Sequence, residues 1–455
     1  MGSRAVVLKL LILAGVSLLL SIVLLRIGWL VDERQARQQE AVASVEQAQA
    51  GAQTLLGPLL LRQCTEEWET LVLDENQERR RSTAKRDFVI SAVPERLQVG
   101  GALNQEARYR GIFKVNGYAG RLQFDAQWAS LQALEPPRAQ QPGGRVQCGP
   151  VQAMLASSDA RGLRAATLKL GEQALAVKPG TGHPAYVRGL HAPLPETLAL
   201  DAPLTLQLSL DLAGTQRFAL VPAAAATALN LRSDWPHPSF GGRFLPSSRE
   251  IGEAGFSAQW QVSELASTAP ADVLQHKVVA GLGGSGNQEI DTLEFAMVDP
   301  VNPYVMSDRA IKYGLMFILL TFVCVGLVEL MSGRRVHPVQ YLLVGLGLSL
   351  FFLLLLSLSE HLSFGPSYLL AAGAAVGLLG YYGAAMLGTW QRGLGFGTGV
   401  AGLYAALYVL LSLEQASLIV GALLLFIVLA AVMVLTRRLD WYALGASATA
   451  ASPSR

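Results

Sequence analysis

The sequence predicts a membrane protein: a six-helix transmembrane bundle with a large β-rich, sandwich-like periplasmic domain inserted between the first and second spans. The chain of 455 residues is 51% hydrophobic and 15% charged, with a mean hydropathy of +0.35, which excludes an ordinary soluble protein and a disordered one. Its apolar runs are long enough to cross a hydrocarbon core of roughly 30 Å. The segment between the first two runs shows the residue alternation of β-strands instead.

The first apolar run, residues 5–25, is interrupted only by Lys9 and predicts an N-terminal transmembrane anchor over residues 1–31. A cleaved signal peptide is the competing interpretation. The run, however, is longer than the roughly 7 to 15 apolar residues of a signal core, and the nearest small-residue cleavage site lies too far downstream. Residues 32–53 are rich in Glu, Gln, Arg and Ala, which predicts a helical stalk.

Residues 54–307 have period-two alternation with frequent Gly and Pro, and predict the β-rich domain. A segment of roughly 250 residues can hold one large core or two smaller ones. Asn116-Gly117 is a turn signal that predicts a hairpin between the strands on either side of it. Residues 136–144, rich in Pro, Gly and Gln, predict an internal linker. The expected strands are 86–90, 109–115, 121–125, 198–200, 204–210 and 218–220.

Five further apolar runs predict a transmembrane bundle over residues 308–442, and residues 443–455 a disordered cytoplasmic tail. Because Lys and Arg accumulate in short cytoplasmic loops, the charged loops place both termini in the cytoplasm and the β-rich domain in the periplasm, at the bacterial inner membrane. The runs begin near Gly314, Val339, Tyr368, Phe396 and Ser417; the basic loops contain Arg334-Arg335, Gln391-Arg392 and Arg437-Arg438, and the acidic loops Glu360-His361 and Glu414-Gln415.

The cysteines and glycines give two packing predictions. Cys64 and Cys148 can form a disulfide if their domain is exported, whereas Cys324 lies within an apolar run. Glycines at small-xxx-small spacing let transmembrane helices approach closely, which predicts a packed bundle rather than a wide pore. These glycines are Gly373 with Gly377 and Gly395 with Gly399.

No cofactor, metal site or catalytic residue is predicted. Residues 281–286 fit the G-x-G-x-x-G pattern, but no βαβ unit surrounds them, and we interpret them as a loop. The sequence has no Walker A lysine, H-E-x-x-H or G-x-S-x-G motif, and the Pro-flanked His183 and His191 make a weak case for metal. The formal net charge of +2 offers no footprint for nucleic acid.

The first candidate functional residues lie in a proline-flanked loop, and another is an acidic residue within an apolar run. Pro236 and Pro238 stiffen the chain around Trp235 and His237, which either present themselves to a partner or close off a sheet. Glu329 is the ionisable residue nearest the membrane interior, where burying charge is costly, so it is a functional candidate by default. The plain alternative is a salt bridge with the basic loop that follows it.

The remaining candidates lie at the two ends of the hairpin formed by the second and third spans. At the outer end, Asp308, Arg309 and Lys312 begin one span while Glu360 and His361 end the next. Antiparallel spans of about 20 residues finish at similar depth, so we expect Glu360 to pair with Arg309 or Lys312, unless all act as separate anchors. At the inner end, the candidates are Arg335 and His337. If the outer pairing fixes the β domain against the bundle, the cytoplasmic loop at Arg334-Arg335 would respond to a periplasmic ligand.

Several stretches spread over nearly the whole chain point to a known family. They are 57–59, 159–163, 233–240, 244–246, 308–310 with 312–313, 335–346, 358–361 and 439–442. These stretches resemble the CreD family of bacterial inner-membrane proteins. The resemblance implies a cell-envelope integrity protein, produced under a two-component system that responds to carbon source and β-lactams, whose loss or excess alters the envelope and tolerance to certain toxins. The family brings no established catalytic residues.

We therefore expect a non-enzymatic protein of the lipid bilayer, active in envelope integrity and the envelope-stress response, whose periplasmic domain binds a protein, a lipid or a cell-wall component. A transporter or flippase is the alternative, although the charges cluster at span ends rather than at mid-membrane. An enzyme acting on lipid or cell-wall precursors would need convergent acid, base or nucleophile residues. Only Glu360 with His361 offers such a pair.

Overall fold

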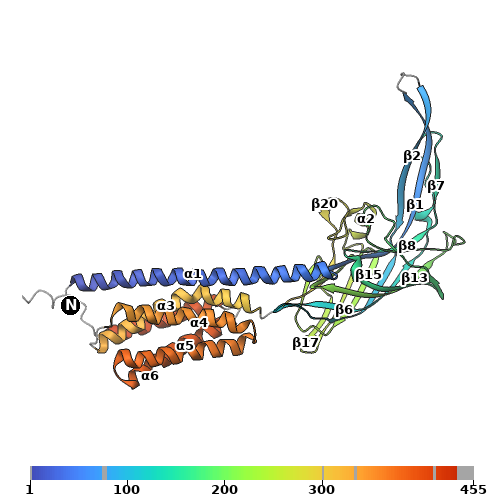
Figure 1. Ribbon diagram of the computed structural model, residues 1–455. Coiled ribbons are helices and arrows are strands. Elements are labelled where there is room, and N and C mark those ends of the chain that lie inside the picture. The colour runs from blue at the N-terminus through green and yellow to red at the C-terminus, as the bar shows by residue number, and fades with distance from the viewer. Residues whose placement is uncertain (1–2, 74–78, 300–301, 333–335, 413–416, 438–455) are drawn as a thin grey trace, which may run out of the picture. The chain divides into compact units, whose positions relative to one another are not determined.

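A computed structural model describes residues 3–73, 79–299, 302–332, 336–412 and 417–437 of the chain (Figure 1). The chain folds as two compact units. The helical unit comprises Met1–Gln39 and Val301–Arg455, and the β domain comprises Glu40–Pro300. Several predicted features lie outside the described residues: Arg334, Arg335, the acidic pair Glu414-Gln415, Arg438 and the tail at 443–455.

The first sheet of the β domain has nine strands in the order β11-β12-β8-β1-β14-β21-β16, with β2 and β7 also paired to β1. Strand β1 is therefore its organising strand. The strands are β1 (Gln53–Leu73), β2 (Arg79–Ala92), β7 (Arg145–Cys148), β8 (Gln152–Ser157), β11 (Lys178–Pro179), β12 (Gly189–Pro193), β14 (Arg217–Leu220), β16 (Pro238–Gly242) and β21 (Leu293–Met297).

The second sheet has eight strands in the order β10-β9-β13-β6-β3-β15-β18-β17. Its strands are β3 (Arg96–Gln105), β6 (Gly117–Trp128), β9 (Leu163–Leu170), β10 (Gln173–Leu175), β13 (Leu204–Thr215), β15 (Ala226–Ser233), β17 (Ser248–Gly252) and β18 (Gly255–Ser263). The short pairs β4 (Arg108–Arg110) with β5 (Phe113–Val115), and β19 (Lys277–Val278) with β20 (Ser285–Glu289), stand apart from both sheets.

The two large sheets share one hydrophobic core. Leu60 and Phe218 of the first sheet lie in the same buried cluster as Phe124, Leu208 and Trp260 of the second. Period-two alternation produces this core, since alternate side chains of a strand point to opposite faces of the sheet. Two antiparallel-rich sheets packed face to face form a sandwich, so the predicted β-rich domain is present with the predicted layering.

The outer faces of the two sheets differ. A second buried cluster covers the nine-stranded sheet, where Leu56 and Met154 from the strands meet Tyr186, Val273 of α2 (Ala269–Leu274) and Ile290. On the eight-stranded sheet the outward side chains are mostly exposed along the middle strands. One face of the sandwich is thus closed by loops and a helix, and the other is open.

A long hairpin of β1 and β2 extends from the sandwich (Figure 1), with Leu60–Leu73 facing Arg79–Ala92. Cys64 of β1 and Cys148 of β7, whose pairing the sequence leaves open, form a disulfide: they lie opposite each other, with Cα atoms 4.0 Å apart. Beside it the buried Glu66 pairs with Arg86 at 2.7 Å. Its carboxylate also accepts the backbone N–H groups of Gln140 and Gln141 at 2.6 and 2.8 Å.

Three local predictions in the β domain are wrong. Residues 136–144 are not a linker between cores, because the buried carboxylate described above ties this loop to the hairpin. The hairpin predicted at Asn116-Gly117 does not form: Gly111 adopts a φ of 60°, and the chain turns there, pairing β4 with β5. Strand β6 pairs instead with β3 and β13. Residues 198–200 are not a strand, although Leu198 and Leu200 pack against the core.

The C-terminal turn of α1 (Ser3–Ala48) is fastened to the sandwich by residues of the stretch 159–163. The Arg161 guanidinium donates to the backbone carbonyls of Glu46, at 2.9 Å, and of Gln47. Asp159 accepts the N–H of Gly51 at 3.1 Å. These contacts satisfy carbonyls that a helix end leaves without intrahelical partners. The Arg161 hydrogen bonds also hold the pKa of Asp159 below its usual value.

The helical unit contains α1, α3 (Pro303–Ser332), α4 (Pro338–Ser359), α5 (Phe364–Leu387), α6 (Trp390–Ser412) and α7 (Ser417–Thr436). Five of these, α1 and α3 to α6, are long and apolar enough to cross a membrane, and α7 contains a shorter apolar helix, Gly421–Val434. Helix α1 runs 46 residues without a break, about 70 Å at roughly 1.5 Å per residue. The predicted anchor and most of the predicted stalk therefore belong to one helix.

Glycines do bring α5 and α6 together, but not the predicted ones. A Cβ at Gly393 would lie 2.4 Å from the Cα of Ala384, and one at Gly397 only 3.3 Å from the Cα of Gly380. The predicted contact glycines, Gly373, Gly377, Gly395 and Gly399, have no atom within 4 Å of an added Cβ. The small-xxx-small spacing therefore identified α5 and α6 as the helices in contact, but it selected glycines on the wrong faces of these helices.

Candidate functional site

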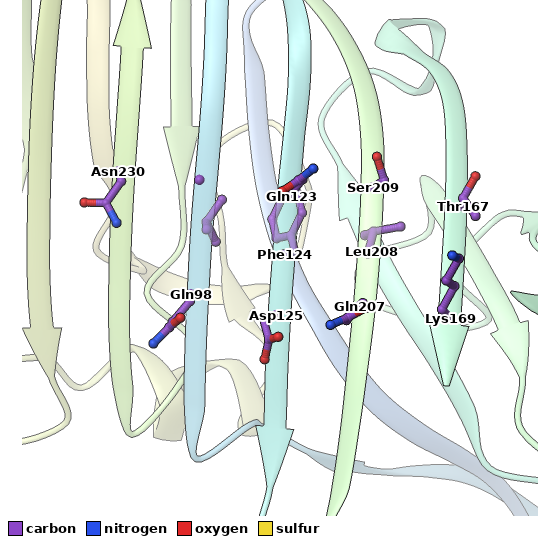
Figure 2. A pocket seen from close by; sticks show the side chains of 12 residues that line it. Gln98, Gln123, Phe124, Asp125, Thr167, Lys169, Gln207, Leu208, Ser209 and Asn230 are labelled. Carbon is purple, nitrogen blue, oxygen red and sulfur yellow. The ribbon is translucent and has the colours of Figure 1, made fainter. Parts of the chain in front are cut away.

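The open face of the eight-stranded sheet is hollowed along its middle strands. One hollow, of about 460 Å³, is lined by residues of β3, β6, β9, β13 and β15, and Figure 2 shows these side chains projecting from neighbouring strands. A second, of about 640 Å³, shares Gly100, Gln123 and Asn230 with the first and continues onto β18. The two hollows form one shallow depression, which is the best candidate for a binding site.

The strand register arranges uncharged polar side chains in a line across this depression. Ser209 lies opposite Thr167 and Gln123, and Asn230 lies opposite Gly100 and Gln259. Gln123 and Gly100 face each other and complete the line. We call these residues, one from each of β9, β13, β6, β3, β15 and β18, the polar row: Thr167, Ser209, Gln123, Gly100, Asn230 and Gln259.

Alternation along each strand explains why these groups face outward. Leu122 and Phe124 are buried in the core, so Gln123 between them points to the open side. In the same way Ser209 lies between the buried Leu208 and Leu210. Gly100 has no side chain, and an added Cβ would meet only a backbone oxygen at 4.0 Å. The missing side chain deepens the depression at its centre.

Charges occur beside the polar row. On one side Arg121 donates to both carboxylate oxygens of Asp211, at 2.6 and 2.9 Å, and this hydrogen bonding lowers the pKa of Asp211. On the other side Lys169 and Asp125 are each register partners of Gln207, so the strand that carries the glutamine separates them. Arg232 also lines the second hollow, on the same side as Arg121. Both rims therefore carry charged side chains, and the row itself is neutral.

Sequence reasoning did not find this site. The alternation at 204–210 predicts a strand, but it assigns no role to the side chains on either face. The available signal was their composition, because Gln123, Gln207 and Ser209 are uncharged where an ordinary solvated strand face would carry Lys and Glu. Bringing them into one row required the pairing of β13 with β6 and β9, which no local pattern reveals.

The two candidates in the proline-flanked loop, Trp235 and His237, lie in different environments. Trp235 is only 5% exposed, and its indole N–H donates to the carbonyl of His237 at 2.8 Å. Lys114 Nζ lies 5.8 Å from the centre of its ring. Trp235 thus helps to close the sandwich core, while the side chain of His237 is exposed.

Glu329 lies in a polar contact inside the helical unit. Its carboxylate forms an ion pair with Lys9 of α1 and accepts a hydrogen bond from the Tyr341 hydroxyl of α4 at 3.0 Å. Lys9 also donates to the Val336 carbonyl at 3.2 Å. The group links three helices. His337 acts locally as the N-cap of α4, since its ring accepts from the N–H of Val339 at 3.3 Å.

The charges expected at the outer end of the hairpin are paired differently. Lys312 contacts Asp308, one turn earlier on α3, at 2.6 Å. Glu360 lies 3.4 Å from the Nε of Arg34 on α1, a partner that the sequence did not suggest. Arg309 is half-buried on α3, and His361 is exposed just beyond α4.

Sequence reasoning also missed a buried aromatic cluster in the β domain. The His183 ring stacks on Tyr186, with centroids 4.9 Å apart, and meets the edge of His276 at 4.6 Å. Burial, with a smaller contribution from His276, lowers the pKa of His183 to about 4. His191 instead contacts the Gly180 carbonyl at 2.6 Å through Nδ1. Within the described part of the chain, no group of three or more His, Cys, Asp or Glu residues is placed to hold a metal.

Comparison with known proteins agrees with this architecture. The family described as Inner membrane protein CreD matches residues 5–442 of the chain. The Inner membrane protein CreD of Escherichia coli (strain K12) is 33% identical over 434 residues, which cover 95% of this chain and 92% of that protein. A match of this extent covers both the helical unit and the β domain. The chain therefore belongs to the CreD family of inner membrane proteins.

Proposed function

We propose that this protein supports the integrity of the cell envelope and acts in the envelope-stress response by binding an envelope component through its β domain. The observation that carries the proposal is the open, hollowed polar face of the eight-stranded sheet. Exposed polar groups arranged in register are suited to recognition.

The proposal places the β domain in the periplasm, with six spans and both termini in the cytoplasm. Membership of an inner membrane protein family supports the location. The disulfide between Cys64 and Cys148 supports it further, because disulfides persist in oxidising compartments such as the periplasm and are rare in the cytoplasm.

We propose binding without catalysis. The residues that line the first hollow are mainly amides and hydroxyls, with Asp125 and Lys169 as the charged members. Those two lie on opposite sides of Gln207. General acid-base or nucleophilic chemistry needs groups within hydrogen-bonding reach of one reacting atom. The lining supports recognition better than reaction.

A complementation assay tests the proposal. A deletion strain carrying the wild-type chain should recover its envelope barrier, measured as exclusion of a large dye and as β-lactam tolerance. The double variant Gln123→Ala/Asn230→Ala should restore neither, although it inserts at wild-type levels. Gln288→Ala, an exposed amide on the separate strand β20, is the matched control and should restore both. Full recovery by the double variant would exclude the polar face as the functional surface.

The ion pair of Lys9 with Glu329 favours a second candidate, a transporter or flippase of an envelope precursor or lipid. Ionisable groups held between transmembrane helices are typical of substrate and proton pathways. Reconstituted wild-type protein would then move a labelled lipid across a vesicle membrane, and Glu329→Gln would abolish the movement. Equal transfer in wild-type, Glu329→Gln and protein-free vesicles would leave Lys9 and Glu329 with a structural role.

A further inference from the structure

We infer that the polar row is a binding site for a neutral glycan strand, whose sugars carry hydroxyl and acetamido groups. This inference deepens the proposed function by naming the site and the chemistry of its ligand. It begins from the composition of the row: Gln123, Asn230 and Gln259 are amides, Thr167 and Ser209 are hydroxyls, and Gly100 opens the centre.

The side chains of the row match a sugar in hydrogen-bonding character. Each Gln or Asn amide offers an acceptor oxygen and a two-proton donor, and each Ser or Thr hydroxyl both donates and accepts. A sugar hydroxyl likewise donates and accepts, and an acetamido group presents one N–H and one C=O. Every group of such a ligand therefore finds a partner without any need for ionic attraction.

Other polymers fit the site less well. An anionic chain would need cations along the row itself, but the row is uncharged. The cations that line the hollows, Lys169, Arg121 and Arg232, lie at its two rims, and Arg121 is already bound through two atoms to Asp211. A peptide that adds a strand would need an open sheet edge. Every strand that contributes to the row has a paired neighbour on both sides. Only side chains are available for contact, which favours a ligand recognised by many short hydrogen bonds.

The dimensions suit an extended chain. Six strands contribute to the row, and at a strand spacing of about 4.8 Å it runs for roughly 24 Å. Figure 2 shows Gln123, Ser209 and Asn230 at one level, with Gln98, Asp125 and Gln207 at the next. A chain of several sugars laid across the strands would contact both levels, with its middle over Gly100.

Binding of chitotetraose, a neutral chain of N-acetylglucosamine, to the full-length protein in nanodiscs tests the inference by calorimetry. Gln123→Ala and Asn230→Ala should each weaken binding about fivefold, as loss of one or two hydrogen bonds predicts. Gly100→Leu should abolish binding by filling the depression. The backbone conformation at position 100 does not require glycine, and a Cβ added there meets no close atom. Gln288→Ala should bind as the wild type does.

Three results would overturn the inference: no binding of chitotetraose to the wild type, unchanged affinity in the Gly100→Leu variant, or preferential binding of polyphosphate or an unstructured peptide. Failure of the glycan inference can be distinguished from failure of the proposed function. If Gln123→Ala/Asn230→Ala fails to restore the envelope barrier while chitotetraose does not bind, the polar face recognises another component and only the glycan assignment is lost.

Discussion

At the scale of single residues, burial of His183 predicts a loss of stability in acid. The pKa of His183 falls from its ordinary value near 6.5 to about 4 in the folded protein. Between these two pH values the unfolded chain therefore binds more protons than the folded one. Stability therefore rises with pH across this window and is lost as pH falls through it. A tenfold difference in proton affinity is worth about 1.4 kcal/mol, so the loss by pH 4 should approach about 3 kcal/mol.

Denaturant titration of the full chain at pH 7 and pH 4 checks this value. Carboxylates also titrate in this pH range. The informative quantity is therefore the pH-dependent loss of stability in the wild type compared with that in His183→Phe, a variant that keeps a flat ring against Tyr186. The variant should lose markedly less stability on acidification. An identical pH dependence in the two proteins would show that His183 does not control it.

Residue-level features were the hardest to read from the sequence. Trp235 and His237 lie on either side of Pro236, yet one is buried and the other is exposed. Glu360 finds its partner in Arg34, more than three hundred positions away in the chain. Charge and hydropathy describe what a side chain can do, but its partner depends on long-range packing, which a single sequence does not encode locally.

At the scale of elements, the contact between α5 and α6 predicts opposite outcomes for two glycines that are two residues apart on α6. Gly393→Ala should destabilise the helix pair by about 1 to 3 kcal/mol, because its Cβ would overlap the backbone at Ala384. Gly395→Ala meets no atom within 4 Å and should be neutral or slightly stabilising. Thermal unfolding in one detergent compares them, and equal melting temperatures would contradict this packing.

The disulfide predicts a second effect at this scale. It joins residues 84 positions apart, and closing a loop of this length stabilises the folded state by about 4.6 kcal/mol in the chain-entropy description. Cys64→Ser with Cys148→Ser should lower the unfolding temperature of the β domain and add protease sites in the β1–β2 hairpin. Cys324→Ser is the control and should leave both unchanged. A resistant hairpin in the double variant would mean that Glu66 and Arg86 suffice to hold it.

Elements were predictable where their pattern is local. Apolar length identified α3 to α6, and alternation identified most of β13 and β14 and parts of β2 and β6, because burial imposes these periods directly. Pairing was not predictable: β1 contacts β8, β14, β2 and β7, and only the cysteines hinted at one of these contacts. The polar row was hidden for the same reason, since it exists only once five pairs of strands are in register.

At the scale of the whole molecule, the number of crossings decides where the C-terminus lies. Helix α7 has 20 residues, about 30 Å at roughly 1.5 Å per residue, which equals the thickness of a hydrocarbon core. We therefore expect α7 to cross, although its apolar part, Gly421–Val434, is short. An even number of crossings returns the C-terminus to the side of the N-terminus, and the basic residues at 334–335, 392 and 437–438 favour the cytoplasm for that side.

Alkaline phosphatase fusions measure this topology, because the enzyme is active only after export. A fusion after Gln105 should be active, and fusions after Arg335 and Trp441 should be inactive. A green fluorescent protein fusion after Trp441 should fluoresce. Activity at Trp441 alone would mean that α7 lies along the membrane and that the chain crosses five times. Activity of the fusion after Arg335 would mean that α3 and α4 cross the membrane in the opposite orientation. The β domain would then lie in the cytoplasm, where Cys64 and Cys148 should be reduced.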